Sequence, residues 1–254
     1  MDIHICDSPI FVVGAPRSGT SMMQWALRQH PRLWGGQESD YLVPLIKGLR
    51  ESFEFGRARG KLHWLSGQGV TWAEFLKHMG YGVNALYTER SGGRRWIEQT
   101  PQYTLHLDEI VVMFPSALFV MMLRDGRDVV HSLRHFVKPQ SHEQACKTWA
   151  RHVEYGLTFA RSSPHSSRLL VVKYEDVVED PEGQLRNVYS FIGETYDPAS
   201  ASFIRDKPRI NSSFDEAARD SAGQGWASWS EHEVAVFNRI AGAQFEEAGF
   251  GGPF

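Results

Sequence analysis

The stretch Ile10-Phe-Val-Val-Gly14-Ala-Pro-Arg17-Ser-Gly19-Thr-Ser21 decides the fold: an apolar run enters a turn bounded by two glycines and followed by hydroxyl residues. A short apolar run that ends at a glycine is typical of a buried strand. The turn between Gly14 and Gly19 aims backbone N–H groups inward, and the following helix presents its positive N-terminal end to an anion. The pattern therefore predicts a P-loop-like, phosphate-binding strand, loop and helix.

The residues around Gly19 indicate which phosphate compound binds. Gly14 and Gly19 have the spacing of the nucleotide loop G-x-x-x-x-G-K-[ST], but Thr20 takes the lysine position and Ser21 the hydroxyl position. In ATP- and GTP-binding proteins the lysine reaches the β- and γ-phosphates. Thr20 replaces this lysine and Arg17 lies inside the turn, which argues against ATP and GTP. The pattern favours a nucleotide with a shorter phosphate chain that ends in a different group, such as a 5′-phosphosulfate.

A second apolar run, residues 117–123, leads directly into Arg124 and a segment typical of a helix start. Ser132 lies about two helical turns farther on and points the same general way as residues 125, 128 and 129. Arg124 and Ser132 are therefore candidates to hold one more phosphate group, because a guanidinium forms bidentate charge-assisted pairs with phosphate. The alternative for Arg124 is a surface ion pair.

Three segments, in their order along the chain, resemble the motifs of the PAPS-dependent sulfotransferases: residues 15–21, Leu123-Arg-Asp-Gly-Arg-Asp-Val-Val-His-Ser132, and Lys173-Tyr-Glu-Asp176. Their style is nearest to bacterial-type relatives of the tyrosylprotein and carbohydrate sulfotransferases. In that family the first motif holds the 5′-phosphosulfate of 3′-phosphoadenosine 5′-phosphosulfate (PAPS). The resemblance assigns this role to Arg17, Ser18, Gly19, Thr20 and Ser21. It assigns the 3′-phosphate to Arg124 and Ser132, and it places Tyr174 near the adenine.

The resemblance implies an enzyme that moves the sulfuryl group of PAPS to a hydroxyl or amine of an acceptor, releases PAP and needs no metal. Arg17 would contact the sulfuryl oxygens. Glu38, in Trp34-Gly-Gly-Gln-Glu38-Ser-Asp40, is the first candidate for the general base, because this segment resembles the Gly-Glu-Glu stretch of tyrosylprotein sulfotransferases. Apolar neighbours would raise the pKa of Glu38 toward neutrality. The alternative role for Glu38 is at the N-terminal cap of the next helix, and His106 is the reserve base.

One residue departs from the family pattern. The segment Trp96-Ile-Glu-Gln-Thr-Pro101 resembles an element in which a lysine stabilises the leaving group, yet Gln99 stands in that place. A glutamine donates hydrogen bonds without carrying charge, which predicts weaker stabilisation of the transition state unless a cation substitutes. The candidate substitutes are Arg94, Arg95 and Lys138.

Apolar runs and helical patterns alternate along the chain. Strands are expected near 10–14, 95–98, 117–123 and 168–173, and helices near 19–30, 102–114, 126–136, 143–162, 180–192 and 230–247. This alternation predicts a single α/β domain over 1–254, with a central parallel sheet flanked by helices and the phosphate loops at its carboxyl edge. The aromatic-rich stretch 39–90 is interpreted as an inserted cap or substrate wall, and 194–229 as a covering loop.

Composition limits the partners and the setting. A formal charge of −3, from 27 basic and 30 acidic residues, argues against a broadly polyanion-binding surface, so no nucleic-acid partner is expected. Two cysteines without paired spacing and no leader pattern predict a cytoplasmic protein. No apolar run approaches the length of a membrane span. His131 and His135 have a metal-ligand spacing, but no glutamate lies between them as in zincins, and no metal site is expected.

Two other functions stay open. A catalytically silent PAPS- or PAP-binding protein would account for Gln99, and an ATP-dependent small-molecule kinase would share the strand, loop and helix but not Thr20 at the lysine position. The acceptor stays open among small molecules, carbohydrates and peptides, because acceptor pockets are built from variable loops. The oligomeric state is also open.

Overall fold

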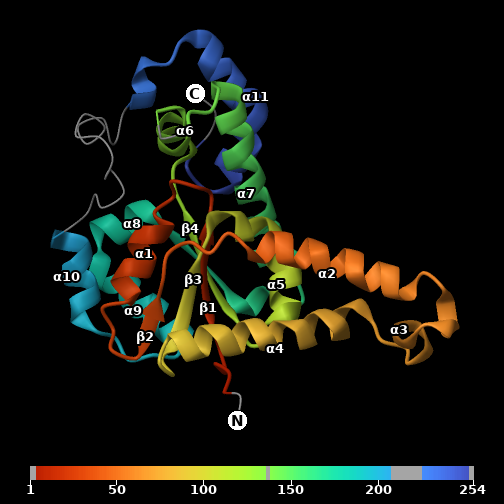
Figure 1. Cartoon of the computed structure of the whole chain (residues 1–254). Helices are drawn as coiled ribbons and strands as arrows, with labels where there is room; N and C mark the ends of the chain where they lie inside the picture. The colour runs from red at the N-terminus through yellow and green to blue at the C-terminus, as the bar shows by residue number, and fades with distance from the viewer. Residues whose placement is uncertain (1–3, 136–137, 207–224, 252–254) are drawn as a thin grey trace.

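The structure is a computed structural model that describes residues 4–135, 138–206 and 225–251. Within these residues, five parallel strands form one sheet in the order β2-β3-β1-β4-β5 (Figure 1). Their bounds are β1 Ile10–Gly14, β2 Leu33–Gly35, β3 Arg95–Gln99, β4 Leu118–Leu123 and β5 Leu169–Lys173. The predicted α/β fold with a central parallel sheet is confirmed.

The central strand β1 is apolar along its whole length because both of its faces are covered. Successive side chains of a strand point to opposite faces, so Phe11 and Val13 enter one hydrophobic cluster while Ile10 and Val12 enter the other. Strand β4 alternates in the same way and pairs with β1 from Ile10 opposite Leu118 onward. The two clusters together make the core on either side of one sheet.

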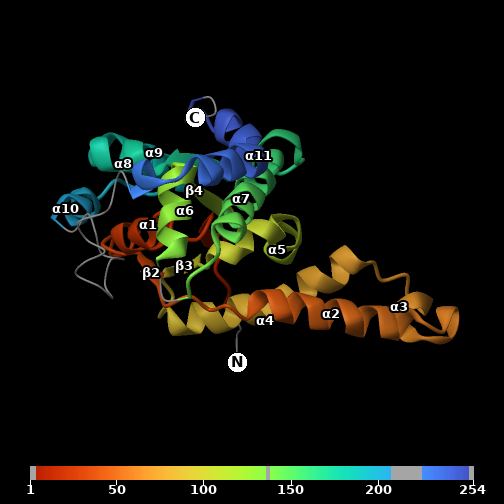
Figure 2. The same ribbon diagram turned by 90° about the horizontal axis from the view of Figure 1, so that it is seen from above.

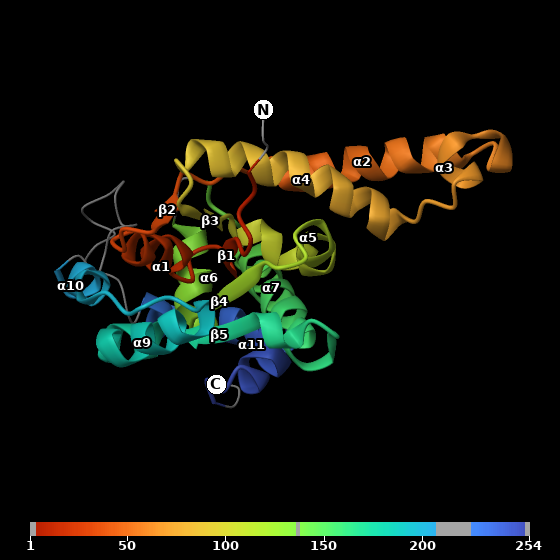
Figure 3. The same ribbon diagram turned by 90° about the horizontal axis from the view of Figure 1, so that it is seen from below.

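Helices cover both faces of the sheet (Figures 2 and 3). The cluster around Ile10 and Val12 is closed by α1 Thr20–Leu27, α8 Tyr174–Glu179, α9 Pro181–Ile192 and α10 Pro198–Asp206. The cluster around Phe11 and Val13 is closed by α5 Leu107–Met113, α6 Gly126–Arg134, α7 His142–Ser162 and α11 Glu231–Glu247. The described residues also form short 3₁₀ turns, which are η1 Gly60–Leu62, η2 Pro101–His106, η3 Ser166–Arg168 and η5 Gly225–Ser228.

Most of the stretch 39–90 forms a helical arm. Helix α2 (Leu42–Arg57) and helix α4 (Trp72–Arg90) are joined through η1 and the short α3 (Trp64–Gly67). Leu42, Ile46 and Leu76 anchor the arm in the core, and its far end extends away from the sheet in all three views (Figures 1–3). The arm is thus well-formed helix, whereas its role as a substrate wall stays a prediction.

Besides the helices of the arm, the structure contains three elements that the sequence patterns did not predict, β2, α8 and α10. The expectation of a loop over 194–229 is wrong for residues 198–206. Proline is favoured in the first turn of a helix, and here Pro198 opens α10 while the Asp197 carboxylate accepts the backbone N–H of Ala199 at 2.9 Å. Ala201 and Ile204 then bury the inner side of α10. Residues 207–224 of the predicted covering loop lie outside the described residues.

Candidate functional site

The site begins at the turn between β1 and α1, on the carboxyl edge of the sheet. Gly14 and Gly19 have φ values of 147° and 91°, in the region that favours glycine. A Cβ on Gly14 would lie 2.4 Å from the Met122 carbonyl oxygen, and one on Gly19 would lie 2.5 Å from the Tyr174 ring. The buried Thr104 hydroxyl accepts the Gly14 N–H at 2.7 Å and so fixes the start of the turn. The turn therefore requires both glycines.

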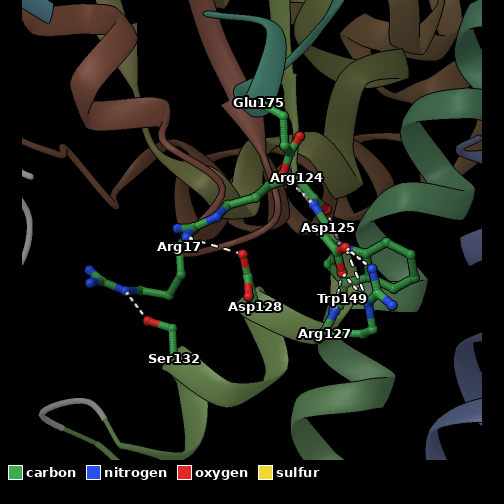
Figure 4. A network of polar contacts seen from close by, with 8 residues as sticks. All are labelled: Arg17, Arg124, Asp125, Arg127, Asp128, Ser132, Trp149 and Glu175. Atoms are coloured by element: carbon green, nitrogen blue, oxygen red, sulfur yellow. Dashed lines mark hydrogen bonds and ion pairs between the residues drawn. The ribbon is translucent and has the colours of Figure 1, made fainter. Parts of the chain in front are cut away.

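Arg17 joins the turn to α6. Its backbone adopts φ 73°, a conformation that costs free energy for a residue with a Cβ and that clusters at functional sites. The Arg17 Nε donates to the Ser132 Oγ at 3.0 Å, and Arg124 Nη1 donates to the Arg17 carbonyl oxygen at 3.1 Å (Figure 4). Residues 17, 124 and 132 are therefore brought together, although more than a hundred positions separate the first from the other two.

Arg124 itself is held from several sides. Its guanidinium lies 4.3 Å from the centre of the Tyr174 ring and 3.7 Å from the Asp128 carboxylate. The Trp149 indole N–H donates to the Arg124 carbonyl oxygen at 3.1 Å (Figure 4). Asp125 then caps α6 by accepting the Arg127 backbone N–H at 2.8 Å. These contacts hold Arg124 beside the turn through its backbone as well as its side chain.

This group of residues fits a phosphate compound. The Ser18 Oγ and the Arg124 Nε are buried atoms that hydrogen bond to no described residue, and both are able to donate. Burial lowers the pKa of Arg17, and the neighbouring positive charge of Arg124 lowers it further. An anion bound between Arg17 and Arg124 would offset the repulsion between their positive charges. The residues present therefore suit the 5′- and 3′-phosphate groups that the motifs implied.

A second group surrounds Glu38, on the segment between β2 and α2. The Gln99 amide Nε2 donates to Glu38 Oε1 at 3.1 Å and to Thr20 Oγ1 at 3.0 Å. The Ser21 hydroxyl donates to the Gln99 Oε1 at 3.2 Å. Gln99 thus connects the proposed base to the two hydroxyls at the start of α1. The residue that departs from the family pattern lies at the centre of this arrangement.

The environment of Glu38 suits a proton acceptor. The residue is exposed to solvent, yet the partial desolvation of its carboxylate raises the pKa, and the hydrogen bond from Gln99 opposes that rise. Asp40 raises the pKa further and Arg17 lowers it. The upward direction agrees with the sequence-based prediction. The alternative role at the next helix is contradicted, because Tyr41 is the N-cap of α2 and the Leu42 N–H at the helix start donates to the Tyr103 hydroxyl at 3.2 Å rather than to Glu38.

Glu98, which is 2% exposed, is a further residue of this group that the sequence patterns did not indicate. Its carboxylate accepts from the Ser39 Oγ at 3.0 Å, the Thr100 Oγ1 at 2.7 Å and the Tyr87 hydroxyl at 3.2 Å. Burial raises the pKa of Glu98, while these hydrogen bonds oppose the rise. Because Ser39 follows Glu38 directly, this buried carboxyl group holds the segment that carries the proposed base. The signal was a glutamate that follows Trp96 and Ile97 directly within a predicted strand, next to Gln99.

Other predicted residues lie elsewhere. His106 ends η2, and its Nδ1 is 3.8 Å from the Glu109 carboxylate rather than in the group around Glu38. Burial lowers the pKa of His106. The rings of His131 and His135 lie 4.4 Å apart, but no cluster of three or more metal-ligating side chains occurs in the described part of the chain.

The prediction that Arg94 or Arg95 substitutes for the missing lysine is wrong. Both precede or begin β3, whereas Gln99 ends it, so the length of the strand separates them from the turn. They line a hollow of about 570 Å³ at the amino-terminal edge of the sheet, and Arg95 is already bound to the carbonyl oxygens of Ser8 and Ile192. The positive charge that does reach this group is that of Arg17, which lowers the pKa of Glu38.

A five-stranded parallel sheet with a glycine-bounded turn after β1, and with Arg124 directly after β4, defines a P-loop-like α/β fold. A family model described as "Sulfotransferase family" matches residues 9–198. The chain belongs to this family, and the family predicted from the three motifs is confirmed.

Known proteins resemble the chain in sequence and in fold. A putative protein-tyrosine sulfotransferase of Caenorhabditis briggsae is 27% identical over 194 residues, which are 74% of this chain and 66% of that protein. The sulfotransferase domain of the Synechococcus PCC 7002 olefin synthase superposes with a TM-score of 0.59 at 19% identity, over 98% of this chain and 95% of that one. A mouse sulfotransferase complexed with PAP superposes with a TM-score of 0.56 at 12% identity, over 94% and 85%.

The chain spans between about four tenths and two thirds of the length of the first curated relatives that it matches. In the described part of the chain, no helix has the length and apolar character needed to cross a membrane.

Proposed function

We propose that this protein transfers the sulfuryl group of PAPS to a hydroxyl group of an acceptor. The observation that carries the proposal is the convergence of Arg17, Arg124, Ser132 and Tyr174, from distant parts of the chain, around one glycine-bounded turn. A 3′-phosphate distinguishes PAP and PAPS from AMP and ATP, and a guanidinium beside a serine hydroxyl is suited to recognise it. Membership of the sulfotransferase family supports the same donor.

Different residues of the chain bind the donor and assist the transfer. The turn and the start of α1 bind the 5′-phosphate through backbone N–H groups, the Thr20 and Ser21 hydroxyls and the positive end of the helix. Glu38 accepts the proton of the acceptor hydroxyl, and Arg17 stabilises the negative charge that grows on the leaving oxygen. When bound, PAPS supplies the sulfuryl group: the acceptor oxygen bonds to sulfur, the bond from sulfur to the phosphate oxygen breaks, and PAP leaves.

For the acceptor we propose a tyrosine hydroxyl of a peptide or protein. Several of the similar curated proteins are named protein-tyrosine sulfotransferases, from Caenorhabditis briggsae, Drosophila melanogaster and Gallus gallus among others. The exposed position of Glu38 supports an acceptor that approaches from solvent with its reactive group on a flexible side chain. A phenol also needs only a weak base, because its pKa lies far below that of an alkyl alcohol.

One observation favours a second function. Gln99 stands where the family resemblance places a lysine, and its side chain already hydrogen bonds to Glu38, Thr20 and Ser21. A protein that binds PAP or PAPS without turning it over would tolerate this uncharged residue. It would bind the nucleotide as tightly as an enzyme and transfer the sulfuryl group to no acceptor.

The deciding experiment compares ligands and then turnover. Calorimetric titration with PAP, AMP and ATP with Mg²⁺ is expected to show tight binding of PAP alone, because PAP alone carries the 3′-phosphate beside the 5′-phosphate. Preference for ATP with Mg²⁺ would refute the assignment in favour of a kinase. Labelling of tyrosine-containing peptides by radiolabelled PAPS would then exclude the silent binder, since the silent binder labels no peptide at any concentration.

A further inference from the structure

The far end of the helical arm carries apolar side chains that the fold does not use. Phe55 is 80% exposed, Leu62 is 92% exposed and Trp64 is 71% exposed. Helix α2 alone is about 24 Å long at 1.5 Å per residue, so this end stands well away from the sheet, as Figures 1–3 show. Residues 55–64 are called the arm tip below. Large exposed apolar groups gathered on one protruding segment are typical of an interaction surface.

The arm has a separate set of residues for its own packing. Phe53 contacts Trp72 and Phe75, with ring centres 5.5 Å and 5.3 Å apart, and the Leu65 side chain lies against Gly56. The Arg50 guanidinium covers the Trp72 ring at 3.8 Å. The three exposed residues of the arm tip take no part in these contacts. Packing within the arm therefore does not account for the apolar character of Phe55, Leu62 and Trp64.

The charge at the arm tip is of one sign. Arg57, Arg59 and Lys61 are all exposed, and the sequence contains no Asp or Glu between Phe55 and Ala73. The 27 basic residues of the chain include these three, which leaves 24 against 30 acidic residues elsewhere. The protein is thus acidic as a whole and basic at the end of the arm. Such local polarity attracts an anionic surface to the arm tip and repels it from the rest.

Aromatic and aliphatic side chains interleaved with Lys and Arg are the composition of segments that lie in the headgroup region of a bilayer. Trp and Phe enter the boundary of the acyl chains, while the long basic side chains reach the anionic headgroups. A convex, protruding tip suits a deformable planar surface, whereas a protein partner would need a matching concavity. Two arm tips would repel each other, which disfavours pairing of two copies through this segment.

We propose that the arm tip docks this protein peripherally on an anionic lipid surface. Phe55, Leu62 and Trp64 enter the headgroup region, and Arg57, Arg59 and Lys61 pair with anionic headgroups. The interaction requires no membrane span and is independent of the transfer reaction.

Flotation of the full chain with vesicles tests the proposal. The protein is expected to bind vesicles that contain phosphatidylserine, to release as ionic strength rises, and to bind pure phosphatidylcholine weakly. Arg59→Gln with Lys61→Gln is expected to weaken binding about 25-fold, at about 5-fold for each cation. Leu62→Ser with Trp64→Ser is expected to weaken it at least as much. The matched control is Val178→Ser with Arg186→Gln, two exposed residues on α8 and α9, which is expected to bind like the wild type.

The arm-tip variants are expected to keep the wild-type melting temperature and PAP affinity, because the substituted side chains are exposed and lie outside the nucleotide site. Failure of the wild type to bind anionic vesicles at low ionic strength would refute the proposal. Unchanged binding by both arm-tip variants would refute it as well. Light scattering supplies a further check: a dimer that Leu62→Ser with Trp64→Ser dissociates would assign the arm tip to a second copy of this chain instead.

Discussion

The side of the site that follows β1 and β4 is built on arginines, whereas the side that follows β2 and β3 is built on glutamates. On the first side Arg17 and Arg124 lie close enough for the charge of one to lower the pKa of the other. On the second side desolvation raises the pKa of Glu38 and of the buried Glu98. Gln99 lies between the sides, bound to Thr20 and to Glu38.

This difference matches the two tasks of a group transfer. The arginine side has excess positive charge and is suited to hold an anion and a developing negative charge. The glutamate side keeps a carboxylate whose affinity for a proton is increased, which is what a general base requires. Because Gln99 is uncharged, it hydrogen bonds to both sides without neutralising the charge of either. Substitutions on each side test that separation.

Removing the base is expected to have the largest effect. Glu38→Gln keeps the hydrogen bond to Gln99 but cannot accept a proton, so kcat is expected to fall about 10²- to 10⁴-fold while PAP affinity is unchanged. Because the pKa of Glu38 is raised, the wild-type rate is expected to fall as pH drops through a value above 4.5. Initial rates across pH measure both effects.

Asp40→Asn is the matched control for this prediction. Asparagine tolerates the φ of 54° found at Asp40, and the loss of the negative charge lowers the pKa of Glu38. The acid limb of the rate is therefore expected to move to lower pH without a loss of kcat at neutral pH. If Glu38→Gln retained the full rate while His106→Ala lost it, His106 would be the base.

The arginine side is expected to show the second largest effect. Arg124→Ala is expected to weaken PAP binding about 100-fold, or about 2.7 kcal/mol, because charge-assisted hydrogen bonds to the 3′-phosphate are lost. AMP lacks that group and is expected to lose far less. Calorimetry with both ligands measures the difference, and Arg186→Ala on the surface of α9 is the control. Equal losses for PAP and AMP would contradict the assignment of the 3′-phosphate.

Glu98 is expected to act on stability. Glu98→Ala removes the carboxylate that accepts from the hydroxyls of Ser39, Thr100 and Tyr87 and is expected to cost about 2–3 kcal/mol of unfolding free energy. The folded-state pKa of Glu98 is raised, so its contribution is greatest below the unfolded value near 4.5 and is lost as pH rises through the folded value. Glu98→Gln is expected to remove that loss. Urea unfolding across pH measures it, and parallel curves for the Glu98→Gln variant and the wild-type protein would exclude this role.

The smallest effect is expected where the two sides meet. Gln99→Lys places a cation beside Thr20 and Glu38 and is expected to raise kcat by about 3- to 10-fold. The gain is limited because the ammonium group also lowers the pKa of Glu38 and moves the acid limb of the rate to lower pH. Gln99→Met is the uncharged control, expected to lose rate. An unchanged rate in the lysine variant would show that Arg17 already supplies sufficient charge.

Local patterns predicted the arginine side almost completely. The apolar run before Gly14, the two glycines, Arg124 and Ser132 are each defined by their immediate neighbours, and the structure brings them together at one edge of the sheet. The glutamate side was predicted only through Glu38. Glu98, Ser39 and Tyr87 meet across strand, loop and arm, and no spacing in the sequence relates them.

The sequence by itself determined the parallel α/β fold, the phosphate-binding turn and the residues that follow the strands, because strand periodicity and glycine conformation act over a few residues. Only the tertiary structure decided that Gln99 connects the base to the turn, that Arg94 and Arg95 lie at the opposite edge, and that the arm tip is apolar and basic on its exposed surface. Those features depend on which distant segments pack together, and burial and hydrogen bonding between such segments follow from the whole fold rather than from any one stretch of it.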